Sequence, residues 1–349
     1  MKKSNKSAPI ALLAGGYSPE GVCAVWSAKH IEKLFQGDEE YQTYLIYVNK
    51  DGWYYEDSNN NEQKIHIDRN NFSLTLPNQE TIKFKLAFLL IGGAPGEDGQ
   101  IQGYLQISNV PFIGCNLLSS AITFNKSIAN RIVRSFNSSI IHVSPSIDVF
   151  RSVSVDDSLV LHALETNHFR LPLIVKPADS GSSLGVTKIT EISQLNEAFN
   201  VAFKESNQIL VEQFIDGREL TVGLFKINGD IQVLPITEIV HQRASGFFDS
   251  ETKFEGSPET QVITPANLNE EIKKRVEIGV RELYEKLNLS GLVRIDLMLR
   301  LPDEKIFFLE VNTAPSQTEY SIIMQQMAQS EWAGDKRIEL YKQLFKEVL

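Results

Sequence analysis

Three residues near the C-terminal end of the chain have side chains that could bind a divalent cation. Asp296 and Glu310 each interrupt an apolar, strand-like run, and Asn312 follows Glu310 by two positions. A carboxylate inside such a run is costly to bury unless it is paired or binds a cation. Two carboxylates and one amide form an all-oxygen ligand set that suits Mg²⁺, with waters and substrate phosphates completing the coordination. The pattern points to a nucleoside triphosphate; the alternative is a pair of edge strands whose acids face solvent.

A lysine followed by a loop of small residues is a second candidate site. Lys176 lies at the end of a predicted strand over residues 173–177, and a Gly/Ser-rich loop leads from it into a strand over residues 185–189. Small residues let backbone N–H groups approach phosphate oxygens, and the lysine supplies positive charge. The segment is not a Walker A loop, because the lysine precedes the glycines and no helix follows. A plain β-hairpin turn is the alternative.

Two further segments place polar groups beside buried strands. Residues 209–214 are predicted to form a buried strand that enters a polar turn, so its backbone could meet an adenine, and Glu219 a ribose hydroxyl. An ordinary strand and turn would fit this segment equally well. The glycine-rich segment 92–103 has an acidic stretch and leads into a helix. It could be a substrate loop or a tight strand-to-helix turn.

The elements that must position these residues follow a βαβ rhythm. Strands are predicted over residues 10–14, 44–48 and 86–91, and a helix over 18–35 would have Ser18 as its N-cap. This alternation implies a parallel, doubly wound sheet. The remaining predicted elements are a hairpin excursion over 51–83, helices from about 100 and over 119–136, 192–203 and 270–287, a hairpin of 220–227 with 231–239, the two acidic strands, and a closing helix.

Composition excludes some classes of partner. The chain has 349 residues, 42% hydrophobic and 22% charged, which is typical of a soluble protein of two or three domains. Its 34 basic and 44 acidic residues give a net charge of −10, which argues against nucleic acid or an anionic membrane as partner. Cys23 and Cys115 lie in apolar contexts, as buried thiols of a reducing compartment do. We find no signal peptide and no run that could span a membrane, and we expect a cytoplasmic protein.

The order and spacing of these segments resemble the D-alanine–D-alanine ligases of the ATP-grasp superfamily, over essentially the whole chain. The matching pieces are Gly15-Gly16-Tyr17-Ser18-Pro19-Glu20, Gly96-Glu97-Asp98-Gly99-Gln100-Ile101-Gln102-Gly103, Ser120-Ala121 with Asn125-Lys126, Val175-Lys176-Pro177 with Gly181-Ser182-Ser183-Leu184-Gly185-Val186, Val211-Glu212-Gln213-Phe214, Gly291-Leu292-Val293-Arg294-Ile295-Asp296, and Glu310-Val311-Asn312-Thr313-Ala314-Pro315.

The resemblance implies an α/β fold with the three-domain ATP-grasp architecture. A doubly wound, Rossmann-like substrate domain would cover residues 1–118, and a central ATP-grasp subdomain would cover 119–214. A C-terminal subdomain over 215–349 would carry the metal site and a lid over 241–261. The family precedent is a homodimer formed through the N-terminal domain.

The resemblance further implies an ATP-dependent ligase that forms D-alanyl-D-alanine for peptidoglycan precursors through an acyl phosphate. Asp296, Glu310 and Asn312 would hold two Mg²⁺ ions, with Mn²⁺ as a substitute. The expected ATP contacts are Lys126, Lys176, Ser183, Glu212, Gln213, Phe214, Ile215 and Glu219. The expected catalytic residues are Glu20, Ser182, Arg294 and Lys253, and the small amino-acid substrates would contact Glu20, Phe254, Ser316 and Ser321.

The departures from the family pattern all lie on the amino-acid side of the site. Gly92 stands where the family has a histidine, Val22-Cys23-Ala24 replaces an acidic-Val-Ser stretch, and Ser316 replaces a glycine. Phe254 replaces a lid tyrosine whose hydroxyl joins Glu20 and Ser182, a change that accompanies hydroxy-acid acceptors in this family. Tyr320 or another aromatic could supply the missing contact.

Two alternatives to a D-alanine–D-alanine ligase follow from these departures. One is a related ATP-grasp ligase with a different acceptor, either D-lactate or another amino acid. The other is a non-catalytic nucleotide-binding paralogue, which the complete set of metal-site acids, arginine and lysines disfavours.

Overall fold

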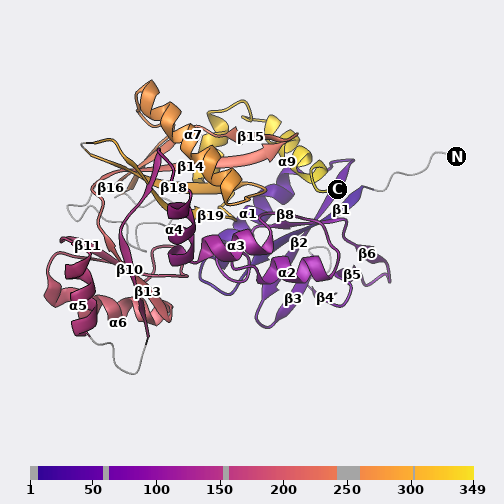
Figure 1. Ribbon diagram of the computed structural model, residues 1–349. Helices are drawn as coiled ribbons and strands as arrows, with labels where there is room; N and C mark the ends of the chain where they lie inside the picture. Colours follow the sequence, from indigo (N-terminus) through magenta and orange to yellow (C-terminus); the bar gives the residue numbers. More distant parts are fainter. Residues whose placement is uncertain (1–6, 58–62, 152–156, 242–259, 302) are drawn as a thin grey trace.

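Three β-sheets with helices packed on them make up the described part of the chain (Figure 1). The computed structural model describes residues 7–57, 63–151, 157–241, 260–301 and 303–349. Lys253 and Phe254 lie outside these residues, as does most of the expected lid. None of the helices in the described part has the length and apolar content that a membrane crossing needs.

The first sheet has parallel strands at its centre and an antiparallel extension. Its strand order is β6-β5-β4-β3-β2-β1-β7-β8, and β1 pairs in parallel with both β2 and β7. The strands predicted over 51–83 extend this sheet on the β2 side. The elements are β1 (Ala8–Gly15), α1 (Gly21–Leu34), β2 (Tyr41–Asn49), β3 (Gly52–Asp57), β4 (Gln63–Asp68), β5 (Ser73–Thr75), β6 (Thr81–Lys83), β7 (Leu86–Leu89), α2 (Gln100–Ile107) and β8 (Phe112–Ile113).

Alternating side chains of β1 enter cores on opposite faces of this sheet. Leu12 packs in one cluster with residues of α1, whereas Leu13 packs in another with Ile101 and Leu105 of α2. Successive strand residues point to opposite faces, so a strand covered on both sides must be apolar throughout. The apolar run of β1 and the helices on both faces confirm the predicted doubly wound sheet.

The second sheet is a small antiparallel unit with helices on it. Its order is β10-β13-β11-β12, and its core contains residues of α5 and α6 (Figure 1). Lys176 lies on β11 and Glu212 on β13, so the two strands that carry these groups are direct neighbours. The elements are β10 (Ser146–Phe150), α5 (Asp157–Thr166), β11 (Leu173–Pro177), β12 (Thr187–Ile189), the 3₁₀ turn η1 (Ile192–Gln194), α6 (Leu195–Glu205) and β13 (Gln208–Gln213).

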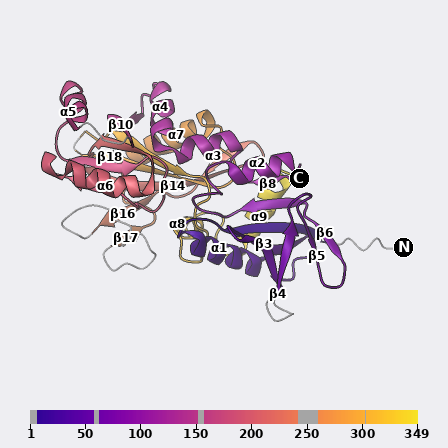
Figure 2. The same ribbon diagram turned by 90° about the horizontal axis from the view of Figure 1, so that it is seen from below.

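The third sheet contains the two acidic strands in its interior. Its order is β17-β16-β14-β18-β19-β9, with β15 paired to β14, and α7 packs on it (Figure 2). Strands β18 and β19 each have a neighbour on both sides, so the edge-strand alternative for these acids is wrong. The elements are β9 (Ile141–Val143), β14 (Gly217–Ile227), β15 (Asp230–Val233), β16 (Thr237–His241), β17 (Thr260–Ile263), α7 (Glu270–Lys286), β18 (Val293–Arg300) and β19 (Ile306–Asn312).

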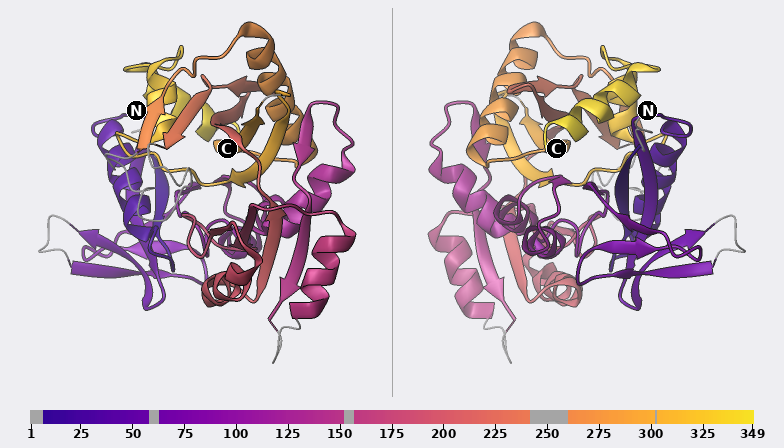
Figure 3. Two further views of the ribbon diagram at one scale, coloured as in Figure 1. Left: turned by 90° about the vertical axis from the view of Figure 1, so that its left-hand side faces the viewer. Right: turned by 90° about the vertical axis from the view of Figure 1, so that its right-hand side faces the viewer.

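The chain returns to the first sheet at its C-terminal end. Helices α8 (Ile322–Ala328) and α9 (Lys336–Lys346) supply residues to the same core as α1 and β1. Figure 3 shows the yellow C-terminal helices beside the indigo N-terminal strands. The C-terminal end of the chain therefore closes the core that its N-terminal end begins.

Several local expectations were wrong. Helix α1 begins at Gly21, and Ser18 does not cap it; its hydroxyl donates to the Gly92 carbonyl oxygen at 3.4 Å. The helix predicted over 119–136 is two helices, α3 (Leu117–Phe124) and α4 (Lys126–Ser135). They separate at Asn125, whose backbone is extended and whose side chain accepts from the Ile128 N–H to cap α4.

Other expectations need refinement. The run predicted over 231–239 is divided between β15 and β16, which pair with opposite ends of β14. Strands β9 and β10 and helix α5 had not been predicted. The domain limits stay a prediction, but β9, expected in the central subdomain, pairs with β19 of the third sheet.

Cys115 is buried, which raises its pKa to about 12, whereas Cys23 is half-buried.

Candidate active site

The acidic residues meet across strands β18 and β19. Asp296 is the cross-strand partner of Glu310, and Arg294 is the partner of Asn312. The Asn312 amide donates to Asp296 Oδ2 at 2.9 Å, and Thr221 of β14 donates to Asp296 Oδ1 at 2.5 Å. Pairing of two interior strands thus brings all three proposed metal ligands together.

Arg294 compensates the buried charge of Asp296. Its Nε and Nη2 donate to the two carboxylate oxygens at 3.0 Å each, and Asp296 is only 5% exposed. Burial alone would lower the pKa of Arg294, but Asp296, and then Glu310 and Glu97, raise it above its ordinary value. The guanidinium stays charged and is aligned beside the carboxylates.

The donor chemistry fits a hard divalent cation. Asp296, Glu310 and Asn312 offer carboxylate and amide oxygens, the ligands that Mg²⁺ prefers. Within the described residues, no group of three or more His, Cys, Asp or Glu side chains is placed to hold a metal ion. This site has only two carboxylates, so substrate phosphates and waters would have to complete the coordination.

Lys126 connects the small-residue loop to the acidic strands. At the start of α4, its Nζ donates to the Ser180 carbonyl oxygen at 2.6 Å and lies 3.2 Å from Glu310 Oε2. Its backbone N–H donates to the Ala178 carbonyl oxygen at 2.7 Å. The expected phosphate loop and the expected metal site therefore meet at one lysine.

Lys176 and Glu212 form a nearly buried ion pair on adjacent strands of the second sheet. Their Nζ and Oε2 atoms are 2.6 Å apart, and the Asn130 amide donates to the other Glu212 oxygen at 2.7 Å. Past Lys176 the chain turns through Ser182 and Ser183, whose φ angles of +48° and +54° are in the left-handed region. Strands β11 and β12 do form an antiparallel hairpin, as the alternative held, but a long loop with two left-handed serines connects them.

Glu20 is enclosed by glycines from two loops. The Ser182 hydroxyl donates to Glu20 Oε1, joining the turn before α1 to the small-residue loop. A Cβ at Gly181 would lie 2.7 Å from Glu20 Oε1, and one at Gly92 would lie 3.3 Å from Oε2. The carboxylate therefore occupies space that side chains at these positions would fill.

Glu97 is a half-buried residue, and its carboxylate had no individual role among the sequence-based predictions. Its Oε2 accepts from the Gly93 N–H at 2.8 Å, and its Oε1 accepts from the Ala314 N–H at 2.9 Å. Burial, with a smaller contribution from Glu20, raises the pKa of Glu97. It links the glycine-rich loop to the segment that follows Asn312. The sequence signals for it were its place in the acidic stretch of that loop and in the family-like segment 96–103.

Several of the remaining residues expected to contact ATP have side chains that already contact other parts of the protein. The Gln213 side chain bonds to the backbone of Arg170 and Pro172, so it braces β11 and does not point to a ligand. The Phe214 ring packs under Lys188 Nζ, 3.8 Å from the ring centroid. Ile215 is buried, and Glu219 lies on β14 opposite Met298. The Gln213 side chain is thus occupied by the protein, and a contact of this segment with ATP through its backbone stays a prediction.

The expected acceptor residues lie in the loop after β19. Ser321 is buried at the N-cap of α8, where its hydroxyl oxygen accepts from the Met324 N–H at 3.4 Å and its proton can still be donated. Ser316 lies four residues beyond Asn312 and is 3.5 Å from Thr318 through their hydroxyls. Tyr320 is 72% exposed.

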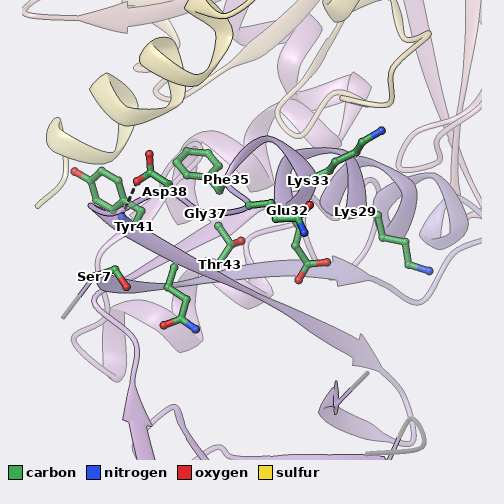
Figure 4. Close-up of a pocket in the computed structure, with 11 residues that line it drawn as sticks. Ser7, Lys29, Glu32, Lys33, Phe35, Gly37, Asp38, Tyr41 and Thr43 are labelled. Carbon is green, nitrogen blue, oxygen red and sulfur yellow. Dashed lines mark hydrogen bonds between the residues drawn. The ribbon is translucent and has the colours of Figure 1, made fainter. Parts of the chain in front are cut away.

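A separate hollow of about 560 Å³ lies on the first sheet beside α1 (Figure 4). Lys29, Glu32 and Lys33 of α1 and Asp38 are among the residues that line it, and none of the proposed site residues does. Asp38 accepts from the Tyr41 N–H at 2.9 Å at its rim. This hollow plays no part in the site described above.

Fold and site together define an ATP-dependent ligase of the ATP-grasp fold. The family model described as D-ala D-ala ligase N-terminus matches residues 9–115, and the one described as D-ala D-ala ligase C-terminus matches residues 140–344. The chain therefore belongs to the D-alanine–D-alanine ligase family.

Individual relatives agree with the family assignment. The chain is similar to D-alanine–D-alanine ligases of Azobacteroides pseudotrichonymphae, 35% identical over 91% of this chain and 94% of that protein, and of Phocaeicola vulgatus, 38% identical over 91% and 93%. Among solved structures, it resembles D-alanyl-alanine synthetase A of Vibrio cholerae, with a TM-score of 0.84 and 25% identity over 98% of both chains. It also resembles the VanG D-Ala:D-Ser ligase of Enterococcus faecalis, with a TM-score of 0.83 and 25% identity over 98% of this chain and 100% of that chain.

Proposed function

We propose that this chain joins two D-alanine molecules at the expense of ATP, for synthesis of peptidoglycan precursors. The observation that supports this best is the position of Lys126, which contacts both the small-residue loop at Ser180 and the acidic strand at Glu310. A nucleotide whose phosphates lie at that loop would have its terminal phosphate beside the metal-site carboxylates. The Glu20–Ser182 pair then lies at the same loop, where a substrate amino group can bind.

The reaction proceeds in two steps. The carboxylate of the first D-alanine attacks the γ-phosphorus of ATP, which releases ADP and leaves an acyl phosphate. The free amine of the second D-alanine attacks the acyl carbon, phosphate leaves, and the nitrogen loses a proton. Phosphoryl transfer of this kind depends mainly on positioning and charge neutralisation, which suits a site made of lysines, an arginine and acids.

Each residue has a proposed task in these steps. Lys126 and Lys176 neutralise phosphate charge, exchanging their present carboxylate partners in part for phosphate oxygens. Glu20 binds the first amino group, and Ser182 orients it. Arg294 and the backbone N–H near Ser316 stabilise the tetrahedral oxyanion. Asp296, Glu310 and Asn312 would hold two Mg²⁺ ions, or Mn²⁺ in their place, which supply charge compensation for the phosphates.

The other expected contacts complete the proposal. The backbone around Glu212, Gln213, Phe214 and Ile215 would border the adenine, Glu219 the ribose, and Ser183 the phosphates. Ser321 would bind the acceptor carboxylate. We also propose that Lys253 reaches the γ-phosphate and that Phe254 borders the acceptor. We further propose a cytoplasmic homodimer built through the N-terminal domain.

Release of ADP or phosphate with a panel of amino acids tests this function. We expect release with D-alanine and Mg²⁺, with D-alanyl-D-alanine as the product identified by mass spectrometry. L-Alanine is the matched control and should support little release. ATP binding without any amino-acid-dependent release would favour the non-catalytic paralogue.

A second acceptor is favoured by one observation, the glycine at position 92. Glycine has no side chain, so the imidazole that the family has at this position is missing. A Cβ at that position would lie 3.3 Å from Glu20 Oε2. The named D-Ala:D-Ser specificity of the Enterococcus faecalis relative shows that this fold serves more than one acceptor. We therefore propose D-lactate or another small acceptor as a competitor of the second D-alanine.

Product analysis with D-alanine alone, and then with D-alanine plus D-lactate, decides between the acceptors. We expect ester product to form beside the dipeptide. We also expect Gly92→His to lower the ester fraction by about tenfold, the effect of roughly one hydrogen bond to a charged group. Dipeptide as the sole product of both proteins would exclude the second acceptor.

A further inference from the structure

A buried glutamine connects the acceptor loop to helices α1 and α9. Gln317 is 1% exposed and lies directly after Ser316. Its backbone N–H donates to the Ser27 hydroxyl oxygen at 2.9 Å, and the Ser27 hydroxyl in turn donates to the Cys23 carbonyl oxygen. Both contacts lie on α1, the helix that begins directly after Glu20.

Two more bonds complete the attachment of Gln317. His30 Nδ1 lies 2.7 Å from the Gln317 carbonyl oxygen, and because a carbonyl can only accept, Nδ1 carries the proton. The Tyr341 hydroxyl of α9 donates to Gln317 Oε1 at 2.8 Å, and both residues are buried. A polar side chain at this depth is tolerated because its partners are in place.

Ser316 therefore lies between two fixed points. On one side Ala314 is held by Glu97, whose other oxygen accepts from Gly93 beside Glu20. On the other side Gln317 is held by α1 and α9. Both attachments lead to elements that border Glu20, the residue proposed to bind the first amino acid.

We propose that Gln317 is a positioning residue for the acceptor, fixing the loop of Ser316 at a set distance from Glu20. This inference rests on the proposed ligase function, because it assigns Ser316 and Glu20 to the two substrates. The acceptor must reach the acyl carbon of a donor held at Glu20, and a small displacement of the loop would separate the two. Gln317 acts through the loop and does not touch either substrate.

Steady-state kinetics of Gln317→Leu and Ser27→Ala tests the proposal. Each change leaves a buried polar group without its partner, so we expect the KM of the acceptor site to rise by about tenfold. The KM values for ATP and for the first D-alanine should change less than about twofold. Ser27→Thr keeps the hydroxyl and should restore the acceptor KM. Gln329→Leu makes the same change on an exposed residue and serves as the control.

Hydrogen exchange of the free protein gives a second, activity-independent measurement. The amides of residues 316–319 should exchange faster in Ser27→Ala than in Ser27→Thr. Unchanged exchange, or an equal effect on the KM values of both amino-acid sites, would overturn the positioning role. A wild-type protein without ligase activity would overturn the proposed function instead, while the exchange comparison would still test the attachment.

Discussion

Both carboxylate oxygens of Asp296 accept hydrogen bonds from other side chains of the protein. Arg294, Thr221 and Asn312 donate to its two oxygens. A cation that binds here must share these oxygens with Arg294, which stays positively charged. The arginine therefore both satisfies the carboxylate in the free protein and limits how many metal bonds Asp296 can make.

Removal of a metal ligand gives the first prediction. Asp296→Asn and Glu310→Gln should each lower Mg²⁺-dependent ATP turnover by about a hundredfold or more, because phosphate charge loses several kcal/mol of compensation. Asp230→Asn, on an exposed residue of the same sheet, should leave turnover unchanged. Phosphate release measures the effect, and circular dichroism verifies the fold. Full activity in either site variant would remove that residue from the metal site.

The second prediction concerns the Lys176–Glu212 pair. Lys176→Met leaves Glu212, 6% exposed, without its ion-pair partner and should lower the free energy of unfolding by about 3–5 kcal/mol. Adding Glu212→Gln should recover part of the loss but not the ATP affinity. Urea unfolding measures the first effect and nucleotide titration the second. Lys204→Met, on an exposed lysine of α6, is the control; equal loss in it would show that the pair is not responsible.

For individual residues, the sequence identified candidate functional side chains better than it identified the groups that they contact. Asp296 and Glu310 were found because each breaks an apolar run. Glu97 and Gln317 had no assigned task, because their partners lie more than 200 positions away or on another sheet. The contacts of the Gln213 side chain with Arg170 and Pro172 were not predicted, since a strand pattern does not say which backbone a side chain will meet.

Among the elements, long and strongly patterned segments were predicted and short ones were not. Helix α7 agrees with its expected range, and β18 and β19 form where the two acidic strands were predicted, because apolar residues run through each of these segments. Strand β9 has three residues and is stabilised by pairing with β19, some 165 positions later in the chain. The α3–α4 break depends on one capping residue, Asn125, which the helical pattern around it concealed.

The contact between α9 and the turn before β2 gives the third prediction. Lys342 Nζ lies 2.5 Å from Asp38. Burial alone would raise the pKa of Asp38, but Lys342 and the N–H groups of Tyr41 and Glu40 together lower it. Its stabilising contribution is therefore complete above the ordinary carboxyl pKa and is lost as pH falls through the lowered value.

Thermal unfolding between pH 7 and pH 2 measures this contribution. Lys342→Met should lower the melting temperature at neutral pH and flatten its decline below about pH 4, the ordinary range for an aspartate. Lys336→Met, at the start of the same helix, is the control. Parallel melting curves for Lys342→Met and the wild type across this range would contradict the assignment.

Over the whole molecule, the two ends of the chain share one core. Phe345 of α9 stacks on Phe35 with ring centroids 5.2 Å apart and meets Tyr41 edge-on at 5.1 Å. The sequence predicted a closing helix but did not reveal which domain that helix joins. The apolar pattern of a helix shows which of its faces is buried but does not identify the element that it packs against.

The shared core gives the last prediction. Phe345→Ala removes a fully buried ring and should destabilise the protein by about 3–5 kcal/mol, the usual cost of such a cavity. Because the cavity opens against Phe35 and Tyr41, amides of β1 and β2 should exchange faster although they lie some 300 positions away. Val348→Ala, three residues further on and 37% exposed, should change neither quantity. A loss of stability that leaves β1 and β2 amides protected would show that α9 does not complete the N-terminal core.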